Sequence, residues 1–202
     1  GILPSNEQVP GEDYRVNDRL KVYITEVKKT TKGPQITVSR THPGLVKRLF
    51  EFEVPEISRG EVLIKNISRE AGSRTKISVY AEDRNIDPVG SCVGYKGTRV
   101  QKIVEELRGE KIDIIKWSDD PRDYIASALS PARVLDVLPA SAEKSAMVVV
   151  PDNQLSLAIG KEGQNARLAA KLTGWKIDIK SQSQAQAAFD RSAPDDNDGR
   201  IP

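Results

Sequence analysis

Cysteine and histidine are almost absent from this sequence of 202 residues, which contains one of each, Cys92 and His42. A single cysteine cannot form a disulfide within the chain, which fits a reducing compartment. One residue of each type cannot build the Cys/His clusters that hold zinc. The two residues lie 50 positions apart with no nucleophile elbow between them. We therefore expect no catalytic residue, no metal ion and no cofactor.

Long apolar runs are also missing. No stretch of 18 apolar residues occurs, so we expect no transmembrane helix and no membrane partner. Residues 1–11 lack the basic start and the apolar core of a secretory signal. We therefore expect a cytoplasmic protein, and we expect a monomer. Gly1 stands where natural chains begin with methionine, so we expect the natural start to lie upstream.

Positive charge is concentrated near the beginning of the chain. The net charge is +2, but residues 181–202 carry −2 and the preceding residues therefore carry +4. The stretch Arg19–Arg48 contains only one acidic residue, Glu26. Its eight basic residues are Arg19, Lys21, Lys28, Lys29, Lys32, Arg40, Lys47 and Arg48. Such an excess favours binding to a polyanion, although a solvated basic face would have the same composition.

One segment of the sequence occurs twice. Gly94-Tyr95-Lys96-Gly97 is followed by a helical pattern, by Gly109 and by Lys111-Ile112-Asp113-Ile114. Gly160-Lys161-Glu162-Gly163 is followed by a second helical pattern, by Gly174 and by Lys176-Ile177-Asp178-Ile179. The offset is 66 residues at the glycine pairs and 65 at the end. The chain therefore contains two copies of one small domain.

Each copy predicts the same order of elements, namely helix, strand, strand, helix, helix and strand. In the first copy Val100, Ile103, Val104 and Leu107 follow the spacing of one helix face. Upstream, the patterns predict a helix near residues 45–50, strands at 61–67 and 75–80 and a polar loop at 68–74. In the second copy they predict a helix near 124–129, strands at 134–138 and 146–150 and a short helix at 155–159. Because the connection at 118–121 is only a few residues long, we expect the copies to pack against each other.

The two ends of the chain differ in character. Residues 19–25 and 34–39 alternate between apolar and polar side chains, which predicts two strands joined by the basic loop Lys28–Lys32. Two strands do not make a stable domain, so either further strands lie upstream or the hairpin leans on its neighbour. From residue 182 the chain has few core-forming residues, and we expect disorder over 182–202.

Glycine pairs placed between two helices favour the binding of phosphate. Without Cβ atoms the backbone can approach a bulky anion, and the following helix presents unpaired amide groups at its N-terminus. Lys96 and Lys161 add positive charge, whereas Glu162 is a departure because a carboxylate repels phosphate. Tyr95 could stack on a base or cover the core. Two such loops in the same context form the KH arrangement, which clamps about four nucleotides of single-stranded RNA per domain.

Further motifs carry a specific resemblance. They are Ser39–Pro43, Phe52–Ile57, Arg69–Gly72, Gly109–Ile114, Ala128–Ala132 and the run Val150–Ala169. Over residues 10–180 the chain resembles the NusA family of bacterial transcription factors. The resemblance implies an α+β chain with two tandem type II KH domains, preceded by a partial β-barrel of the OB fold. The implied division is 1–41 for the truncated barrel, 42–118 and 119–181 for the KH domains, and 182–202 for the disordered tail.

The same resemblance implies a function and partners. The chain would bind single-stranded nascent RNA as it leaves RNA polymerase, and would take part in pausing, termination and antitermination together with RNA polymerase and other Nus factors. An alternative is the RNA-binding appendage of an RNA-processing enzyme similar to polynucleotide phosphorylase, and another is a ribosomal protein. The candidate RNA-binding residues are Gly94, Tyr95, Lys96, Gly97, Arg99, Lys102, Gly160, Lys161, Glu162, Gly163, Gln164, Asn165, Arg167, and from the basic stretch Arg40, His42, Lys47 and Arg48.

Overall fold

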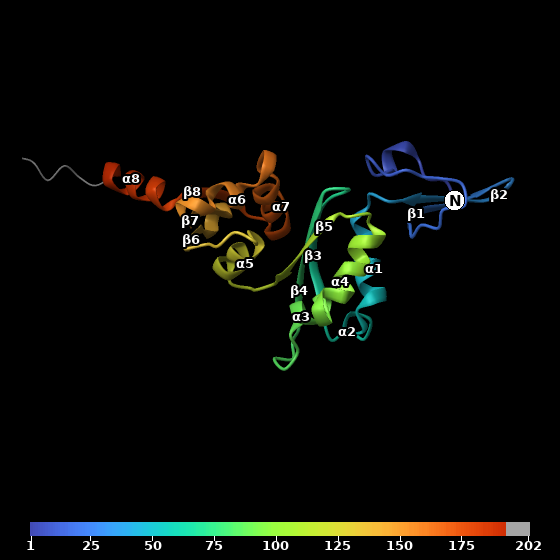
Figure 1. Cartoon of the computed structure of the whole chain (residues 1–202), viewed down its shortest axis with the longest axis horizontal. Helices are drawn as coiled ribbons and strands as arrows, with labels where there is room; N and C mark the ends of the chain where they lie inside the picture. The colour runs from blue at the N-terminus through green and yellow to red at the C-terminus, as the bar shows by residue number, and fades with distance from the viewer. Residues whose placement is uncertain (193–202) are drawn as a thin grey trace, which may run out of the picture.

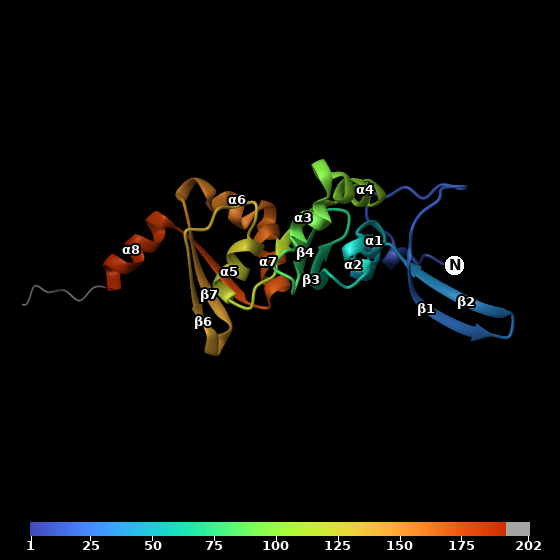
Figure 2. The ribbon, with the colours of Figure 1, turned by 90° about the horizontal axis from the view of Figure 1, so that it is seen from below.

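The computed structural model describes residues 1–192 and places three parts of the chain in a row. The N-terminal hairpin lies at one end, the first repeat in the middle, and the second repeat with a final helix at the other end (Figures 1 and 2). In the part of the chain that the structure describes, no helix is long and apolar enough to cross a membrane. The described residues also hold no group of three or more His, Cys, Asp or Glu side chains that is suited to a metal ion.

The N-terminal part forms a two-stranded antiparallel sheet. A short 3-10 helix, η1 (Ser5–Glu7), precedes β1 (Tyr23–Thr30) and β2 (Gly33–Ser39). Lys28 and Lys29 lie on β1, so the turn is shorter than the predicted basic loop. An isolated bridge joins Ile2 to Thr37. Across residues 1–192 this sheet does not close into a barrel. Arg40, directly after β2, binds Glu106 of the first KH domain. The hairpin thus contacts its neighbour, which is one of the two arrangements expected.

The first KH domain follows the predicted order of elements. Its elements are α1 (Pro43–Glu53), α2 (Pro55–Ser58), β3 (Leu63–Glu70), β4 (Arg74–Tyr80), α3 (Pro88–Val93), η2 (Tyr95–Gly97), α4 (Thr98–Glu106) and β5 (Lys111–Lys116). His42 caps α1 by accepting a hydrogen bond from the Gly44 amide, and proline occupies the first helical turn. The central strand β4 pairs antiparallel with β3 and parallel with β5. Ser68–Glu70 belong to β3, so the predicted polar loop is confined to the turn that follows.

The second KH domain repeats this topology. Its elements are α5 (Pro121–Ala128), β6 (Asp136–Ala140), η3 (Ser141–Glu143), β7 (Ser145–Val150), η4 (Asp152–Gln154), α6 (Leu155–Ile159), η5 (Lys161–Gly163), α7 (Gln164–Thr173) and β8 (Lys176–Ser181). Strand β7 pairs antiparallel with β6 and parallel with β8. The sheet orders β3-β4-β5 and β6-β7-β8 are therefore equivalent, which confirms the duplication.

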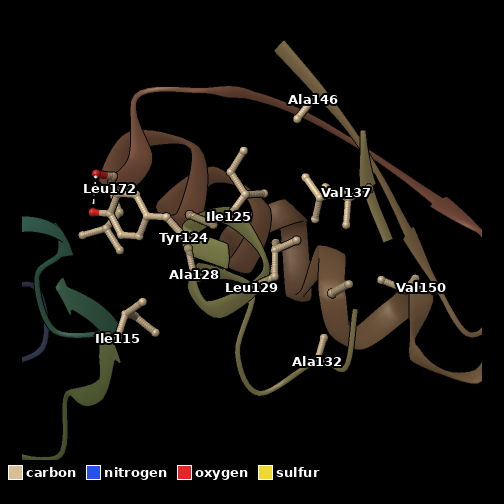
Figure 3. Packing of buried hydrophobic residues seen from close by; sticks show 13 residues of the cluster. Ile115, Tyr124, Ile125, Ala128, Leu129, Ala132, Val137, Ala146, Val150 and Leu172 are labelled. Atoms are coloured by element: carbon tan, nitrogen blue, oxygen red, sulfur yellow. Dashed lines mark hydrogen bonds between the residues drawn. The ribbon is translucent and has the colours of Figure 1, made fainter. Parts of the chain in front are cut away.

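The two KH domains pack against each other, as the short connection predicts. Ile115 on β5 of the first domain joins the apolar core of the second, together with Ile125 and Leu129 (Figure 3). The buried hydroxyl of Tyr124 on α5 lies 2.9 Å from Ser78 Oγ on β4. Figure 1 shows α7 beside the strands of the first domain. The second domain thus rests on the sheet of the first, and the relation between the two glycine loops is set by this interface.

The expectation of disorder from residue 182 is wrong for the first half of the tail. Gln182–Ser192 form the helix α8. Alanine has the highest helix propensity, and the helix contains Ala185, Ala187 and Ala188. Ser181 Oγ accepts a hydrogen bond from the Gln184 amide, which satisfies one free donor of the first turn. Residues 193–202, for which disorder was also expected, lie outside the described residues.

Candidate nucleic-acid interface

The two glycine loops have the same backbone conformation. Gly94 has φ 76° and ψ 172°, and Gly160 has φ 78° and ψ 170°. The third residue of each loop, Lys96 or Glu162, is left-handed although it is not glycine, with φ 51° or 54°. Such a conformation is uncommon for residues with a Cβ. Two separate segments therefore adopt one strained backbone conformation, as expected of a shared loop function.

The two glycines of each loop have different surroundings. A Cβ on Gly94 would lie 2.6 Å from the Arg99 side chain, and a Cβ on Gly160 would lie 2.8 Å from the Asn165 amide nitrogen. The first glycine thus allows the helix to fold back over the loop. A Cβ on Gly97 or Gly163 would meet nothing within 4 Å. The second glycine faces open space, where a ligand can reach the loop backbone.

The helices that follow the loops begin without a side-chain cap. Gly97 precedes α4 and Gly163 precedes α7, and neither position supplies a capping hydrogen bond. The first amide of each helix donates to a loop carbonyl, Thr98 to Tyr95 and Gln164 to Lys161, but no side chain caps either helix. Each helix end therefore carries partial positive charge. An anion at either loop would accept hydrogen bonds from backbone amides and would be attracted by the positive end of the helix.

Four side chains project from the two loops. Tyr95 is 80 % exposed, so it does not cover the core. The Lys96 Nζ lies 5.4 Å from the centroid of the Tyr95 ring, which places a cation beside an exposed aromatic face. Lys161 and Glu162 are also exposed. The first loop thus presents an aromatic ring and a cation, whereas the second presents one charge of each sign.

Arg99 and Asn165 occupy equivalent positions in the two copies, and each stabilises its glycine loop through side-chain hydrogen bonds. Arg99 Nη1 donates to the Ser91 carbonyl at 2.6 Å and to Glu56 Oε2 at 2.9 Å. Asn165 Nδ2 donates to the Ala158 carbonyl at 3.0 Å and to a second carbonyl in the same domain. Asn165 is 1 % exposed. The Asn165 side-chain amide is therefore buried in the turn that it stabilises, which disfavours RNA contact by this side chain; that contact stays a prediction.

The family comparisons agree with this duplicated geometry. A model of the NusA-like first KH domain matches residues 40–117, and a model of the NusA-like second KH domain matches residues 121–187. The transcription termination/antitermination protein NusA of Halalkalibacterium halodurans is 68 % identical over 185 residues, covering 92 % of this chain and 48 % of that protein. The chain belongs to the NusA family.

Other NusA proteins show the same relation. The Bacillus subtilis protein is 68 % identical over 185 residues, covering 92 % of this chain and 50 % of its own length. The Thermus thermophilus protein is 46 % identical over 200 residues, covering 98 % of this chain and 52 % of its own length. This NusA-family chain therefore spans about half the length of the curated relatives that it matches.

Arg40 was predicted as an RNA contact of this NusA-family chain, but the structure buries it completely. Arg40 Nη2 lies 2.7 Å from Glu12 Oε1, and Nη1 lies 3.1 Å from Glu106 Oε1. Nη1 also donates to the Lys21 carbonyl at 2.8 Å. Two carboxylates that are distant in sequence thus neutralise Arg40, and RNA contact by Arg40 stays a prediction that its burial disfavours. Arg40 joins the hairpin to α4 instead.

The remaining candidates of the basic stretch lie away from the loops, on or beside α1. His42 stacks on Tyr23 with ring centroids 4.5 Å apart, and its Nδ1 accepts the Gly44 amide. Lys47 and Arg48 are exposed on α1, and Arg48 is paired with Glu51 at 2.6 Å. RNA contact by these three residues stays a prediction.

Glu70 of the first domain is a functional candidate that the sequence did not reveal. Its carboxylate accepts from Arg167 Nε at 2.6 Å and from Gln164 Nε2 at 2.7 Å. Both donors lie in the first turn of α7 in the second domain. Hydrogen bonds from Arg167 and Gln164 hold the pKa of the Glu70 carboxyl below its ordinary value. The candidate Lys102 is paired at 3.4 Å with Glu53, which belongs to the same domain.

Proposed function

We propose that this chain binds single-stranded RNA through its two glycine loops. The observation that carries the proposal is the shared loop conformation, in which Gly97 and Gly163 face open space before an uncapped helix. Such a surface suits the phosphates of an extended strand, while the adjoining groove of a KH domain accommodates bases. Two packed domains would hold about eight nucleotides.

Membership of the NusA family supports a proposal for the biological setting of this activity. The relatives are named transcription termination/antitermination proteins, so we infer that the chain contacts nascent RNA at RNA polymerase together with other Nus factors. In this proposal the chain acts in the cytoplasm as a monomer, without catalysis. The NusA-like match of both KH domains favours this setting over the appendage of an RNA-processing enzyme.

The proposal is tested with a labelled RNA of about 12 nucleotides, long enough to span both domains. Fluorescence anisotropy compares this RNA with the same sequence as single-stranded DNA and as duplex RNA. The informative variant is Gly97→Asp combined with Gly163→Asp, since aspartate fits the open space, tolerates the left-handed backbone and repels phosphate. We expect a preference for single-stranded RNA and a loss of affinity of at least about tenfold in the variant.

Gly174→Asp is the matched control. Gly174 has φ 74°, close to the 73° of Gly163, and a Cβ there also meets nothing within 4 Å. It lies at the opposite end of α7, roughly 15 Å along the helix axis. The control should bind RNA as the wild type does. Equal binding of all three nucleic acids, or equal loss in the control, would show that only a basic surface is present.

A further inference from the structure

At the second glycine loop, a carboxylate of the other KH domain binds the first turn of the following helix. Glu70 ends β3, and its carboxylate contacts both Gln164 and Arg167 on the first turn of α7. Ser73, in the turn after Glu70, also accepts from Gln164 Nε2 at 2.7 Å. The polar side chains that α7 would offer to RNA are thus already bound to the first domain, and a carboxylate lies where an incoming phosphate would find the same donors.

The first loop lacks an equivalent contact. The positions that match Gln164 and Arg167 are Thr98 and Gln101, given the offset of 66 residues. Gln101 hydrogen-bonds Glu105 of its own helix at 3.5 Å. Within residues 1–192, only the second loop therefore has its helix start neutralised by a carboxylate of the other KH domain.

The contact between Glu70 and Arg167 is accessible enough for a phosphate to take the place of Glu70. The side chains of Arg167 and Glu70 are 45 % and 26 % exposed, and partly exposed ion pairs are held weakly. A phosphate offers the Arg167 guanidinium the same charge-assisted hydrogen bonds that Glu70 does, in a geometry that suits the planar group. A phosphate would also replace the negative charge of Glu70 at the start of α7.

Breaking this contact does not require the domains to separate. The interface retains the Tyr124–Ser78 hydrogen bond. The buried Lys76 also donates to the Ser130 carbonyl at 2.8 Å. Arg167 Nη1 donates to the Glu162 carbonyl in the loop at 3.1 Å, so the guanidinium stays beside the loop when Glu70 is released.

We propose that Glu70 is a specificity-determining residue that competes with RNA phosphate for Arg167 and Gln164 at the second loop. This inference rests on the proposed RNA binding. In the free chain Glu70 satisfies the start of α7 and lowers the affinity of the second loop for anions. An RNA strand long enough to reach both loops displaces Glu70, so the second loop selects ligands that are already held by the first.

The test uses Glu70→Gln, which keeps the size of the side chain and removes its charge. RNA affinity is measured by anisotropy of the same labelled RNA over a series of salt concentrations. We expect affinity to rise about threefold at low salt, since RNA no longer has to displace the Glu70 carboxylate from Arg167. The gain should shrink as salt is raised, because salt screens the repulsion between this carboxylate and phosphate.

Two comparisons isolate the exchange. Glu61→Gln removes the same charge from an exposed pair with Arg59 that does not involve either loop, so it reports the effect of net charge alone. Arg167→Gln removes the cation for which Glu70 and phosphate compete. Adding Glu70→Gln to this variant should therefore change RNA affinity no more than Glu61→Gln does. A gain in Glu70→Gln that equals the gain in Glu61→Gln, or that survives in the Arg167→Gln background, would overturn the proposal.

A fall in affinity would also overturn it, because Glu70 would then support the loop rather than compete with RNA. The glycine variants remain a separate control on the proposed function. If Gly97→Asp and Gly163→Asp leave binding unchanged, the glycine-loop assignment is wrong. The comparison of Glu70→Gln with and without Arg167 still reports whether the exchange occurs.

Discussion

The ammonium group of Lys76 on β4 connects the two KH domains by donating to the Ser130 carbonyl at 2.8 Å. The same group is 2.9 Å from Asp113 Oδ2 on the neighbouring strand β5. Lys76 is fully buried, and burial lowers its pKa. A charge inside this interface is therefore tolerated because one carboxylate and one carbonyl surround it.

The first prediction concerns the loss of either partner. Asp113→Asn leaves the Lys76 charge buried without its carboxylate, and we expect it to reduce the free energy of unfolding by about 2–4 kcal/mol. Lys76→Met removes the buried charge, while Arg74 still pairs with Asp113 at 2.7 Å. We therefore expect this variant to cost less, about 1–2 kcal/mol. Urea unfolding measures both, and a larger loss for Lys76→Met would contradict this account.

The second prediction is the acid response of the same cluster. Burial alone would raise the pKa of Asp113, but hydrogen bonds and charges from Arg74 and Lys76 outweigh it and hold the pKa below its ordinary value. A carboxyl whose pKa is lower in the folded state stabilises the fold above its unfolded pKa and loses that effect as pH falls through the folded pKa. Stability should therefore fall on acidification below about pH 4, and less steeply in Asp113→Asn. Urea midpoints of both proteins at about pH 6 and about pH 3 test this, and parallel curves would argue against it.

The third prediction separates structure from RNA contact at Arg40. Its guanidinium binds Glu12 through two nitrogens, at 2.7 and 3.1 Å, and also binds Glu106. Lysine cannot reproduce this planar set of donors, so Arg40→Lys should destabilise the chain by about 2–4 kcal/mol. Arg48→Lys, on an exposed side chain of the same basic stretch, should change stability by less than about 0.5 kcal/mol. RNA affinity should be unchanged in both where the proteins are folded. Weaker RNA binding by a fully folded Arg40→Lys variant would restore the sequence-based prediction.

The sequence predicted those features of the fold that depend on local patterns. The helical spacing after Gly97 and the repeated Lys-Ile-Asp-Ile segments gave the order of elements in both domains, because such periodicities report one buried face. The polar loop was predicted too long, because the polar residues Ser68, Arg69 and Glu70 belong to strand β3. In the structure Arg69 is neutralised by the buried Glu110, at 3.1 Å, from another part of the domain.

The sequence could not show which candidate residues have partners that are distant in the chain. Arg40 looks basic and free in the sequence, yet Glu106 lies 66 residues away and contacts it. The partner of Arg167 is Glu70, 97 residues earlier and in the other domain. Asn165 follows a glycine loop as an exposed polar residue would, yet its side-chain amide is buried and donates to the Leu129 and Ala158 carbonyls. Spacing places side chains along an element but does not reveal what lies across from them.

The fourth prediction concerns the single thiol. Cys92 is fully buried in the core of the first domain, and burial raises its pKa to about 12. The thiolate is the reactive form, so Cys92 should not react with a thiol reagent in the folded chain at about pH 8. In concentrated urea it should react at the rate of an ordinary thiol. Rapid modification of the folded protein would show that the helix α3 opens locally, because the core does not otherwise admit the reagent.

The last prediction uses the difference in charge between the two loops. Lys96 and Glu162 occupy equivalent left-handed positions, and both are exposed. Exchanging the charge at each position therefore forms a matched pair of variants. Glu162→Lys should raise RNA affinity and steepen the salt dependence by about 0.7, whereas Lys96→Glu should lower affinity and flatten the dependence by at least as much. Neither change should alter the free energy of unfolding by more than about 0.5 kcal/mol, since both side chains lie in solvent. If the two variants shift affinity in the same direction, the loops do not contribute to RNA binding through charge, and the bases rather than the phosphates must dominate at this interface.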